Sequence, residues 1–574
     1  MIKAAKIFGS HMVLQQGKEI KLWGTASPGQ TIEGIWEMEH HKGCERRIFT
    51  ADDKGCWQVS FPPQPPSAGA RITIRSGGEC LMWEDILIGE VWIAGGQSNM
   101  EYPLDLDAEK EAALKGRMYS NIRFFDVPEV SYLGEEEDHD YKDYGFWRRC
   151  TPKDLPFFSA VGYYFAEALF GARNVPVGII GCNWGGTACC SWTDPKLLAR
   201  GPGAVWLREY EAGMSEGLDM EEERNWFCKK PENDRTDLLY RKPDMWTKLW
   251  RRIMYPGSHS EKELEELEAS LKRLEQQVEA KIKAQGFPGR EGQTSAISPY
   301  SQHRPGALYE HMVKKIAPYP VRGVLWYQGE SDHVHAKVYQ DVLISMIACW
   351  RSLWREELPF LLVQLAPFGR WIESSGRRYP VLRRCQEAAA LKLPGVYLAS
   401  SSDAGMEWDV HPKRKRPIGR RLSLLARKYV YREDILADAP AAKKAYLIQD
   451  GAEILFEYGD GLYLAGDELD GLQVADAWGG EVSVSGVQVQ KGRLHVVSSQ
   501  IQAGAKIRLG MEGYYQVNLY NEAGIPAIPF ELVVEENVDW DCRYAPCNRA
   551  LPAGRCVCEF GICSSEWRTC QIFG

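Results

Sequence analysis

The stretch that most constrains this chain is a buried-strand pattern that ends in two glycines and is closely followed by a serine. Residues 86–94 are mostly apolar, and Gly95, Gly96, Gln97 and Ser98 follow them. Two glycines allow the backbone to turn sharply where a strand ends. In open α/β sheets the carboxyl ends of the strands form the edge at which ligands bind. The pattern predicts that Ser98 is presented at such an edge, although a serine here also suits the cap of a helix.

Two further segments place polar side chains directly after predicted strands. Residues 324–332 read VLWYQGESD, and residues 403–411 read DAGMEWDVH after a third apolar run. Acyl transfer by a serine needs a base that takes its proton and a carboxylate that orients the base. Ser98, Asp409 and His411 supply these groups in that chain order.

These three residues receive separate roles in ester hydrolysis. We predict Ser98 as the nucleophile, His411 as the general base and Asp409 as the acid that orients the imidazole. Asp403 and Glu407 are close enough in sequence to replace Asp409 as the acid. A carboxylate that caps its own loop is the structural alternative for Asp409.

The motifs GGQSNM, LWYQGESD and DVHPKRKRPIGRRL resemble sequence blocks of the sialate O-acetylesterase family, a branch of the SGNH hydrolases. The resemblance covers most of residues 5–530. It includes the segment VPVGIIGCNWGGT at 175–187, which contains Gly185 and Gly186. It implies an α/β fold of the SGNH type, with a doubly wound parallel sheet and flanking β-sandwich domains. It also implies an oxyanion hole built from the Ser98 backbone N–H, a backbone N–H of Gly185 or Gly186, and the Gln328 side-chain amide.

The periodicity of apolar residues divides the chain into three folded parts. Residues 1–82 and 436–536 alternate apolar and polar residues between turn signals, which predicts two β-sandwiches. Between them, residues 83–435 alternate strand and helix patterns, which predicts a parallel sheet with helices on both faces. The predicted strands are 86–94, 121–125, 175–182, 322–327, 359–365 and 395–400. The predicted helices are 159–170, 306–316, 336–354, 379–392 and 416–430.

Two segments stand apart from this plan. An insertion at about 195–300 carries apolar residues at spacings of three and four from Leu264 to Val278. This spacing predicts a long amphipathic helix, which either roofs the active site or meets a second subunit in a homo-oligomer. The final residues, 537–574, form a Cys-rich tail whose cysteine spacing does not match that of a zinc site.

Composition narrows the classes of partner. At 574 residues the chain is too long for a single core, and its net charge of -9 includes no basic stripe that would suit a nucleic acid. No window approaches the roughly 18 uninterrupted apolar residues of a membrane span. The first residues lack the apolar stretch of a signal peptide, so we expect a cytoplasmic enzyme.

We expect the reaction to use no metal and no other cofactor. His333 and His335 beside Asp332 suggest a metal site, but two histidines in a loop are usually solvated.

The resemblance implies an acetylated sugar as substrate and a serine esterase that works through an acetyl-enzyme on Ser98. Sialic acid is the first choice, and an arginine would then bind its carboxylate, with Arg370, Arg383 and Arg384 as candidates. The alternative is deacetylation of hemicellulose-derived oligosaccharides of xylan, xyloglucan or mannan. A more distant alternative is a carbohydrate-binding protein without activity.

Overall fold

The structure is a computed structural model that describes residues 1–39, 44–116, 119–138, 143–215, 298–371 and 374–536, with six scattered residues between 216 and 297. Residues 1–535 form one compact unit. The helix predicted from Leu264 to Val278 and the Cys-rich tail at 537–574 lie outside the described residues.

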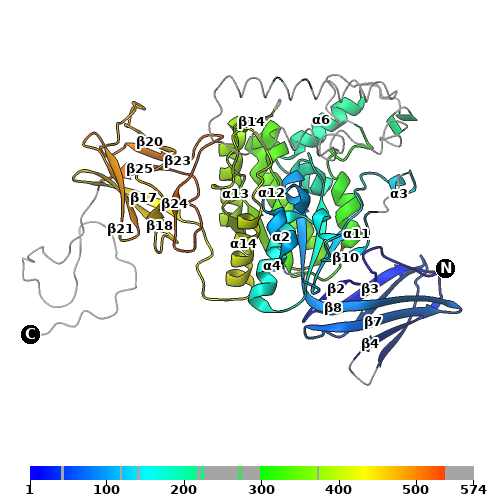
Figure 1. The fold of residues 1–574 in the computed structure, drawn as a ribbon. Coiled ribbons are helices and arrows are strands. Elements are labelled where there is room, and N and C mark those ends of the chain that lie inside the picture. The colour runs from blue at the N-terminus through cyan, green and yellow to red at the C-terminus, as the bar shows by residue number, and fades with distance from the viewer. Residues whose placement is uncertain are drawn as a thin grey trace, which may run out of the picture. The chain divides into compact units, whose positions relative to one another are not determined.

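The N-terminal part of this unit consists of strands that pair antiparallel, apart from β2, which lies parallel to β8 (Figure 1). One sheet has the order β1-β3-β6, and a second group joins β4 to β5 and β7, with β7 pairing to β8. The bounds are β1 (Lys3–Ala4), β2 (Val13–Gln15), β3 (Ile20–Thr25), β4 (Thr31–Met38), β5 (Cys44–Thr50), β6 (Cys56–Phe61) and β7 (Ser67–Ser76).

A single strand, β8 (Glu79–Gly96), links this N-terminal part to the central sheet. Its first half pairs with β7 in antiparallel fashion, whereas its second half lies parallel to both β11 and β12. The change falls between Ile88, the last residue that pairs with β7, and Glu90, the first that pairs with β11. Asp85, with a left-handed backbone at φ 54°, lies at an irregularity of the β7 pairing. The predicted boundary between residues 82 and 83 therefore lies within a continuous strand.

The central sheet carries six parallel strands in the order β9-β11-β8-β12-β13-β16, and β10 pairs antiparallel to β9 at the edge. Most of the central-strand residues are buried, as expected for a parallel sheet covered on both faces. The bounds are β9 (Ile122–Asp126), β10 (Trp147–Arg149), β11 (Val177–Asn183), β12 (Gly323–Tyr327), β13 (Phe360–Val363) and β16 (Val396–Ala399).

Helices cover both faces of this sheet (Figure 1). Trp92 and Gly95 point to opposite faces of β8 because side chains alternate along a strand. Trp92 contacts Phe165 of α4, whereas a Cβ at Gly95 would lie 3.3 Å from Trp350 of α12. The main helices are α4 (Ala160–Arg173), α12 (Tyr339–Trp354), α13 (Tyr379–Lys392) and α14 (Arg416–Leu425).

Shorter elements connect the strands and helices. They are α1 (Ser98–Glu101), η1 (Leu104–Leu106), α2 (Lys110–Lys115), α3 (Glu135–Asp138), η2 (Leu155–Phe157), η3 (Cys189–Trp192), α5 (Pro195–Leu198), α6 (Ala204–Ser215), η4 (Tyr309–Val313), α11 (Lys314–Ile316), η5 (Glu330–Val338), β14 (Arg370–Trp371), β15 (Ser374–Ser375), η6 (Gly376–Arg378) and η7 (Ala426–Val430).

The C-terminal part is a seven-stranded sheet in the order β20-β23-β25-β17-β18-β22-β21, with β19 and β24 as a separate pair. Its buried side chains form an apolar cluster of their own, separate from the cluster that the N-terminal and central parts share. The bounds are β17 (Ala441–Ile448), β18 (Gly451–Glu457), β19 (Tyr463–Leu464), β20 (Leu472–Ala475), β21 (Gly486–Gln490), β22 (Arg493–Val497), β23 (Lys506–Leu509), β24 (Leu519–Tyr520) and β25 (Phe530–Glu535).

The predicted elements of the central part agree closely with those of this mixed α/β structure. Each of the six predicted strands overlaps a strand of the parallel sheet. The predicted helix at 306–316 includes the π-helical turn η4, and the helix predicted to reach residue 430 ends in the π-helical turn η7. In the described part of the chain, no helix is both long and apolar enough to span a membrane.

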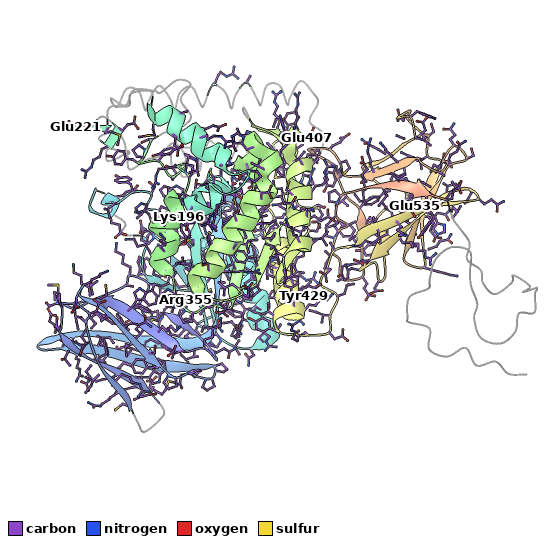
Figure 2. All side chains as sticks on the ribbon, turned by 180° about the vertical axis from the view of Figure 1, so that it is seen from behind. Lys196, Glu221, Arg355, Glu407, Tyr429 and Glu535 are labelled. Atoms are coloured by element: carbon purple, nitrogen blue, oxygen red, sulfur yellow. The ribbon has the colours of Figure 1, made fainter. Side chains whose placement is uncertain are left out.

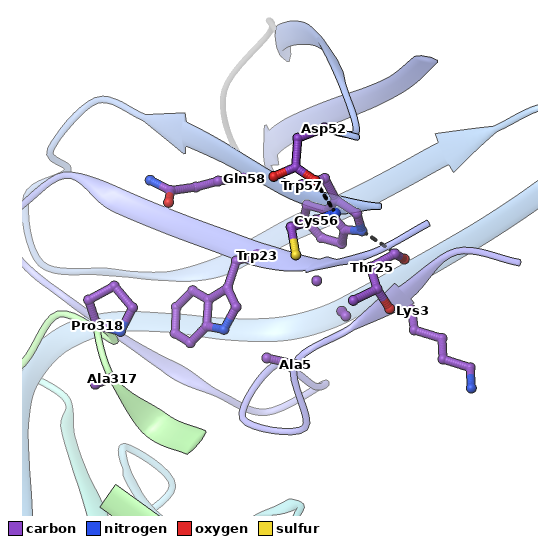
Figure 3. Close-up of a pocket in the computed structure, with 12 residues that line it drawn as sticks. Lys3, Ala5, Trp23, Thr25, Asp52, Cys56, Trp57, Gln58, Ala317 and Pro318 are labelled. Atoms are coloured by element: carbon purple, nitrogen blue, oxygen red, sulfur yellow. Dashed lines mark hydrogen bonds between the residues drawn. The ribbon is translucent and has the colours of Figure 1, made fainter. Parts of the chain in front are cut away.

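A groove of about 540 Å³ opens on the N-terminal sheet, beside Trp23 and Trp57 (Figure 3). Its other walls include Asp52, Gln58 and Pro318. None of the residues predicted for ester hydrolysis lines this groove, so the candidate site must be built from the strand ends instead.

Candidate active site

The chain turns sharply between β8 and Ser98, the first residue of α1. Gly96 has φ +140°, and a Cβ at this position would lie 2.1 Å from the carbonyl oxygen of Tyr327. Only glycine fits so close an approach of β8 to the end of β12. The Gln97 side chain continues this link, because its Oε1 accepts hydrogen bonds from the Gly329 and Ser331 backbone N–H groups, at 3.3 Å each.

The structure brings Ser98 and His411 together. The two side chains join at 2.9 Å between Ser98 Oγ and His411 Nε2, across 313 residues of sequence. Ser98 is half-buried at the end of β8, and His411 is 5% exposed in the loop that follows β16. A buried imidazole at this distance can accept the serine proton when the hydroxyl attacks a carbonyl carbon.

Asp409 lies on the Nδ1 side of His411, away from Ser98, and is 1% exposed. Its Oδ1 accepts a hydrogen bond from the His411 backbone N–H at 2.9 Å and lies 3.5 Å from the ring nitrogen Nδ1. The two alternative acids lie elsewhere. Asp403 forms a double hydrogen bond to Arg421 at 2.6 Å per oxygen, and Glu407 is exposed on the same loop (Figure 2).

A lysine that the sequence reasoning missed also contacts this carboxylate. Lys413 Nζ lies 2.7 Å from Asp409 Oδ2, and both side chains are buried. Burial alone would raise the pKa of Asp409, but the ammonium of Lys413 and the imidazole of His411 hold that pKa below its ordinary value. Burial lowers the pKa of His411, and Lys413 and Lys415 lower it further against the opposing effect of Asp409.

Asn99 ties the nucleophile segment to the histidine loop. Its Nδ2 donates to the Val410 carbonyl at 3.0 Å and to Glu330 Oε1 at 2.5 Å, while its Oδ1 accepts from Lys415 Nζ at 2.5 Å. Burial raises the pKa of Glu330 and lowers the pKa of Lys415 to about 7. This buried network fixes the residues on either side of the Ser98–His411 contact.

Of the two predicted oxyanion glycines, Gly185 lies beside Ser98. A Cβ at Gly185 would lie 3.3 Å from the Cβ of Ser98, and a Cβ at Gly186 would lie 3.5 Å from the ring of His303. The Gly185 backbone N–H donates to Glu101 Oε2 at 2.6 Å. This amide therefore already binds a negatively charged oxygen, which is the chemistry that an oxyanion hole requires.

The side chain of Gln328 is buried and fully engaged in the structure. Its Nε2 donates to Asp332 Oδ2 at 2.5 Å and to the Thr187 carbonyl at 3.1 Å, and it lies 3.2 Å from Gln97 Oε1. Burial raises the pKa of Asp332 to about 7 against the lowering effect of the Gln328 hydrogen bond. In this state the amide supports the loop after β12, and its role toward an oxyanion stays a prediction.

The three arginines predicted to bind a substrate carboxylate lie in different settings. Arg383 is buried and donates to the carbonyl oxygens of Glu512 and Gly513, with its guanidinium 5.0 Å from the ring of Tyr515. It therefore anchors α13 to the C-terminal part. Arg370 and Arg384 are exposed, and the Arg370 backbone N–H donates to the Glu407 carbonyl in the histidine loop.

The imidazoles of His333 and His335 do not converge on a common point. His333 Nδ1 lies 3.0 Å from the Glu330 carbonyl oxygen, whereas His335 Nε2 lies 2.8 Å from Glu209 of α6. Across the described residues, no group of three histidine, cysteine or acidic side chains is arranged to hold a metal ion.

Sequence comparison shows that the chain is similar to esterases. Residues 291–423 match the family model described as carbohydrate esterase, sialic acid-specific acetylesterase. The sialate O-acetylesterase of Mus musculus is 23% identical over 486 residues, which cover 79% of this chain and 78% of the mouse protein. The Homo sapiens sialate O-acetylesterase is 22% identical over 475 residues, or 77% of this chain and 74% of the human protein.

Structural comparison agrees with the sequence matches. A novel carbohydrate acetylesterase from Xanthomonas citri has a crystal structure with a TM-score of 0.67 and 25% identity, and the match covers 92% of this chain and 99% of that chain. These findings confirm the resemblance to the sialate O-acetylesterase family. They also confirm the prediction of a carboxylic ester hydrolase.

Proposed function

We propose that this carboxylic ester hydrolase, whose chain resembles the sialate O-acetylesterases, removes O-acetyl groups from carbohydrates through an acetyl-enzyme on Ser98. The 2.9 Å contact between Ser98 Oγ and His411 Nε2 carries the proposal. Ser98 attacks the acetyl carbonyl while His411 takes its proton, and the sugar leaves with that proton returned to its oxygen. Water activated by His411 then attacks the acetyl-enzyme and releases acetate.

Asp409 is the proposed orienting acid, supported by its burial and its 3.5 Å separation from His411 Nδ1. The proposed oxyanion donors are the backbone N–H groups of Ser98 and of Gly185 or Gly186, with the Gln328 amide as a further donor. For Gly185 to act, the developing oxyanion must replace the Glu101 carboxylate that now accepts from its N–H. For Gln328 to act, its amide must leave one of its present acceptors.

We also propose that the fold is of the SGNH type, and the positions of the site residues at strand ends support this proposal. Ser98, Gln328 and the loop of His411 each follow a strand of the parallel sheet, namely β8, β12 and β16. Ligands bind at this edge in open α/β sheets.

Sialic acid is the first proposed substrate, because both the matching family model and the curated relatives carry that description. One structural observation favours the alternative, a neutral hemicellulose-derived oligosaccharide. Arg383, Lys413 and Lys415 are already held by protein partners, so these three cations are not available to a substrate carboxylate.

One experiment tests the reaction and separates the two substrates. Purified protein is incubated with acetylated sialic acids and with acetylated xylan, xyloglucan and mannan oligosaccharides, and the released acetate is measured. Acetate from sialates alone supports the first substrate, and faster release from the neutral oligosaccharides supports the second. If neither these sugars nor p-nitrophenyl acetate releases acetate, the proposed activity is wrong.

A further inference from the structure

We propose that Lys413 is a positioning residue of the esterase site. Its side chain shares the Asp409 carboxylate with His411 and keeps the imidazole available as a base in mildly acidic solution. The inference rests on the proposed function, because it concerns the same serine, histidine and aspartate.

The geometry of the carboxylate carries this inference. Lys413 Nζ approaches Asp409 Oδ2 to 2.7 Å, whereas Oδ1 of the same carboxylate lies 3.5 Å from His411 Nδ1. The closer ionic partner of the acid is therefore the lysine. All three side chains are buried, so solvent screens their charges only weakly.

Lys415 is a second lysine close to His411, and both lie near the ring of Tyr102. Its ring lies 6.2 Å from the His411 ring, with Lys413 Nζ at 5.2 Å and Lys415 Nζ at 4.7 Å from the ring centroid of Tyr102. The hydroxyl of Tyr102 donates to the Leu106 carbonyl at 2.7 Å, which holds the ring in place. The side chains of Lys413, Lys415 and His411 therefore all lie close to the ring of Tyr102.

Charged groups on the neighbouring elements complete the surroundings of His411. Asp409, Lys413 and Lys415 face it from its own loop, and Ser98 and Tyr102 face it from α1 and its C-terminal cap. Glu101 of α1 adds a carboxyl group near Ser98, where it accepts from the Gly185 backbone N–H. Two further acids are engaged with Lys415. Glu330 of η5 interacts with it electrostatically, and Asp107 Oδ2 accepts from its backbone N–H at 2.8 Å.

The direction of the effect follows from these charges. A protonated imidazole carries positive charge, which the nearby ammonium groups repel, so the neutral base is favoured. Lys413 also neutralises Asp409, which would otherwise stabilise the imidazolium. Both effects lower the pKa of His411 and add to its burial, which is the largest cause of the shift below the ordinary value.

The test is the pH dependence of kcat/KM for p-nitrophenyl acetate in Lys413→Met and Lys413→Arg. Without the ammonium, the pKa of His411 rises, and the acid limb of the profile should move to higher pH by about one unit. Lys413→Arg keeps the charge and should keep the wild-type limb. Arg414→Met, at the exposed neighbouring position, is the matched control and should leave the profile unchanged.

Each outcome bears on a separate statement. An active Lys413→Met with an unshifted limb, or one slowed equally at every pH, overturns the role of Lys413 but leaves the proposed function intact. An active Ser98→Ala protein overturns the proposed function itself. If Lys413→Met does not fold, as judged by its thermal melting, Lys413→Gln replaces it under the same criteria.

Discussion

Ser98 Oγ and His411 Nε2 lie 2.9 Å apart although the strand end and the loop that carry them are 313 residues apart in sequence. The contact depends on β8 ending next to β12 and on the Asn99 network that holds the histidine loop. The predictions below separate the residues that act in the proposed reaction from those that hold them in place.

Replacing Ser98 with alanine should abolish ester hydrolysis, because no other group then attacks the acetyl carbonyl. In subtilisin-type triads this loss is on the order of a millionfold in kcat. Ser98 is half-buried at the surface of the site, so the melting temperature should stay close to that of the wild type. Acetate release and thermal melting measure the two effects, and appreciable residual turnover would move the nucleophile elsewhere.

Asp409→Asn should reduce kcat strongly, on the order of ten-thousandfold if the acid acts as in known triads. The matched control is Asp403→Asn, which breaks the pair with the buried Arg421 guanidinium. It should lower the free energy of unfolding by about 3 kcal/mol while kcat stays near normal. Urea denaturation and kcat separate the two variants, and a slow Asp403→Asn with an unaffected Asp409→Asn would reverse the assignment.

Asn99→Ala should lower kcat by about 10- to 100-fold with a smaller change in KM, because it frees the histidine loop from the nucleophile segment. Asn99→Asp is the informative companion. It keeps an oxygen acceptor for Lys415 but loses the amide donors to Glu330 and the Val410 carbonyl. Steady-state kinetics on p-nitrophenyl acetate give the answer, and wild-type kcat in both variants would remove Asn99 from any positioning role.

The arginines should separate into one structural residue and two surface residues. Arg383→Ala leaves the Glu512 and Gly513 carbonyls without their charged donor, so the free energy of unfolding should fall by about 2 kcal/mol. The variant should not raise KM selectively for a charged substrate. Arg370→Ala should raise KM for acetylated sialic acid but not for p-nitrophenyl acetate if sialate is the substrate. Arg384→Ala serves as the exposed control, and an unchanged sialate KM in Arg370→Ala favours a neutral sugar.

Local sequence was sufficient to predict the strand ends that carry the site. The apolar run before Gly95 and Gly96 predicts a buried strand and a turn, and the structure has both at β8 and α1. The motif with Asp409 and His411 likewise follows a predicted strand that exists as β16. In these cases the deciding physics lies within about ten consecutive residues.

Contacts between distant segments could not be predicted in the same way. The sequence around Arg383 has the pattern of any surface helix. The two carbonyl groups that accept hydrogen bonds from its side chain lie about 130 residues away in the C-terminal part. Lys413 lies four residues after Asp409, which is a local signal for an ion pair on a helix, but this segment is a loop. His303 beside Gly186 follows the insertion and carries no motif that would assign it to the site.

The continuous strand β8 has a consequence for how this protein can be divided. One strand joins the antiparallel strands of the N-terminal part to the parallel strands of the central part, and its last residues lead directly to Ser98. A fragment that begins at residue 83 would start inside that strand and lack β7, so Trp83, Ile86 and Ile88 of β8 would lose their partners. The N-terminal part is therefore not a module that recombination or protein engineering can remove or exchange cleanly at this junction, because any cut there unpairs the first half of the strand whose other end leads to the nucleophile.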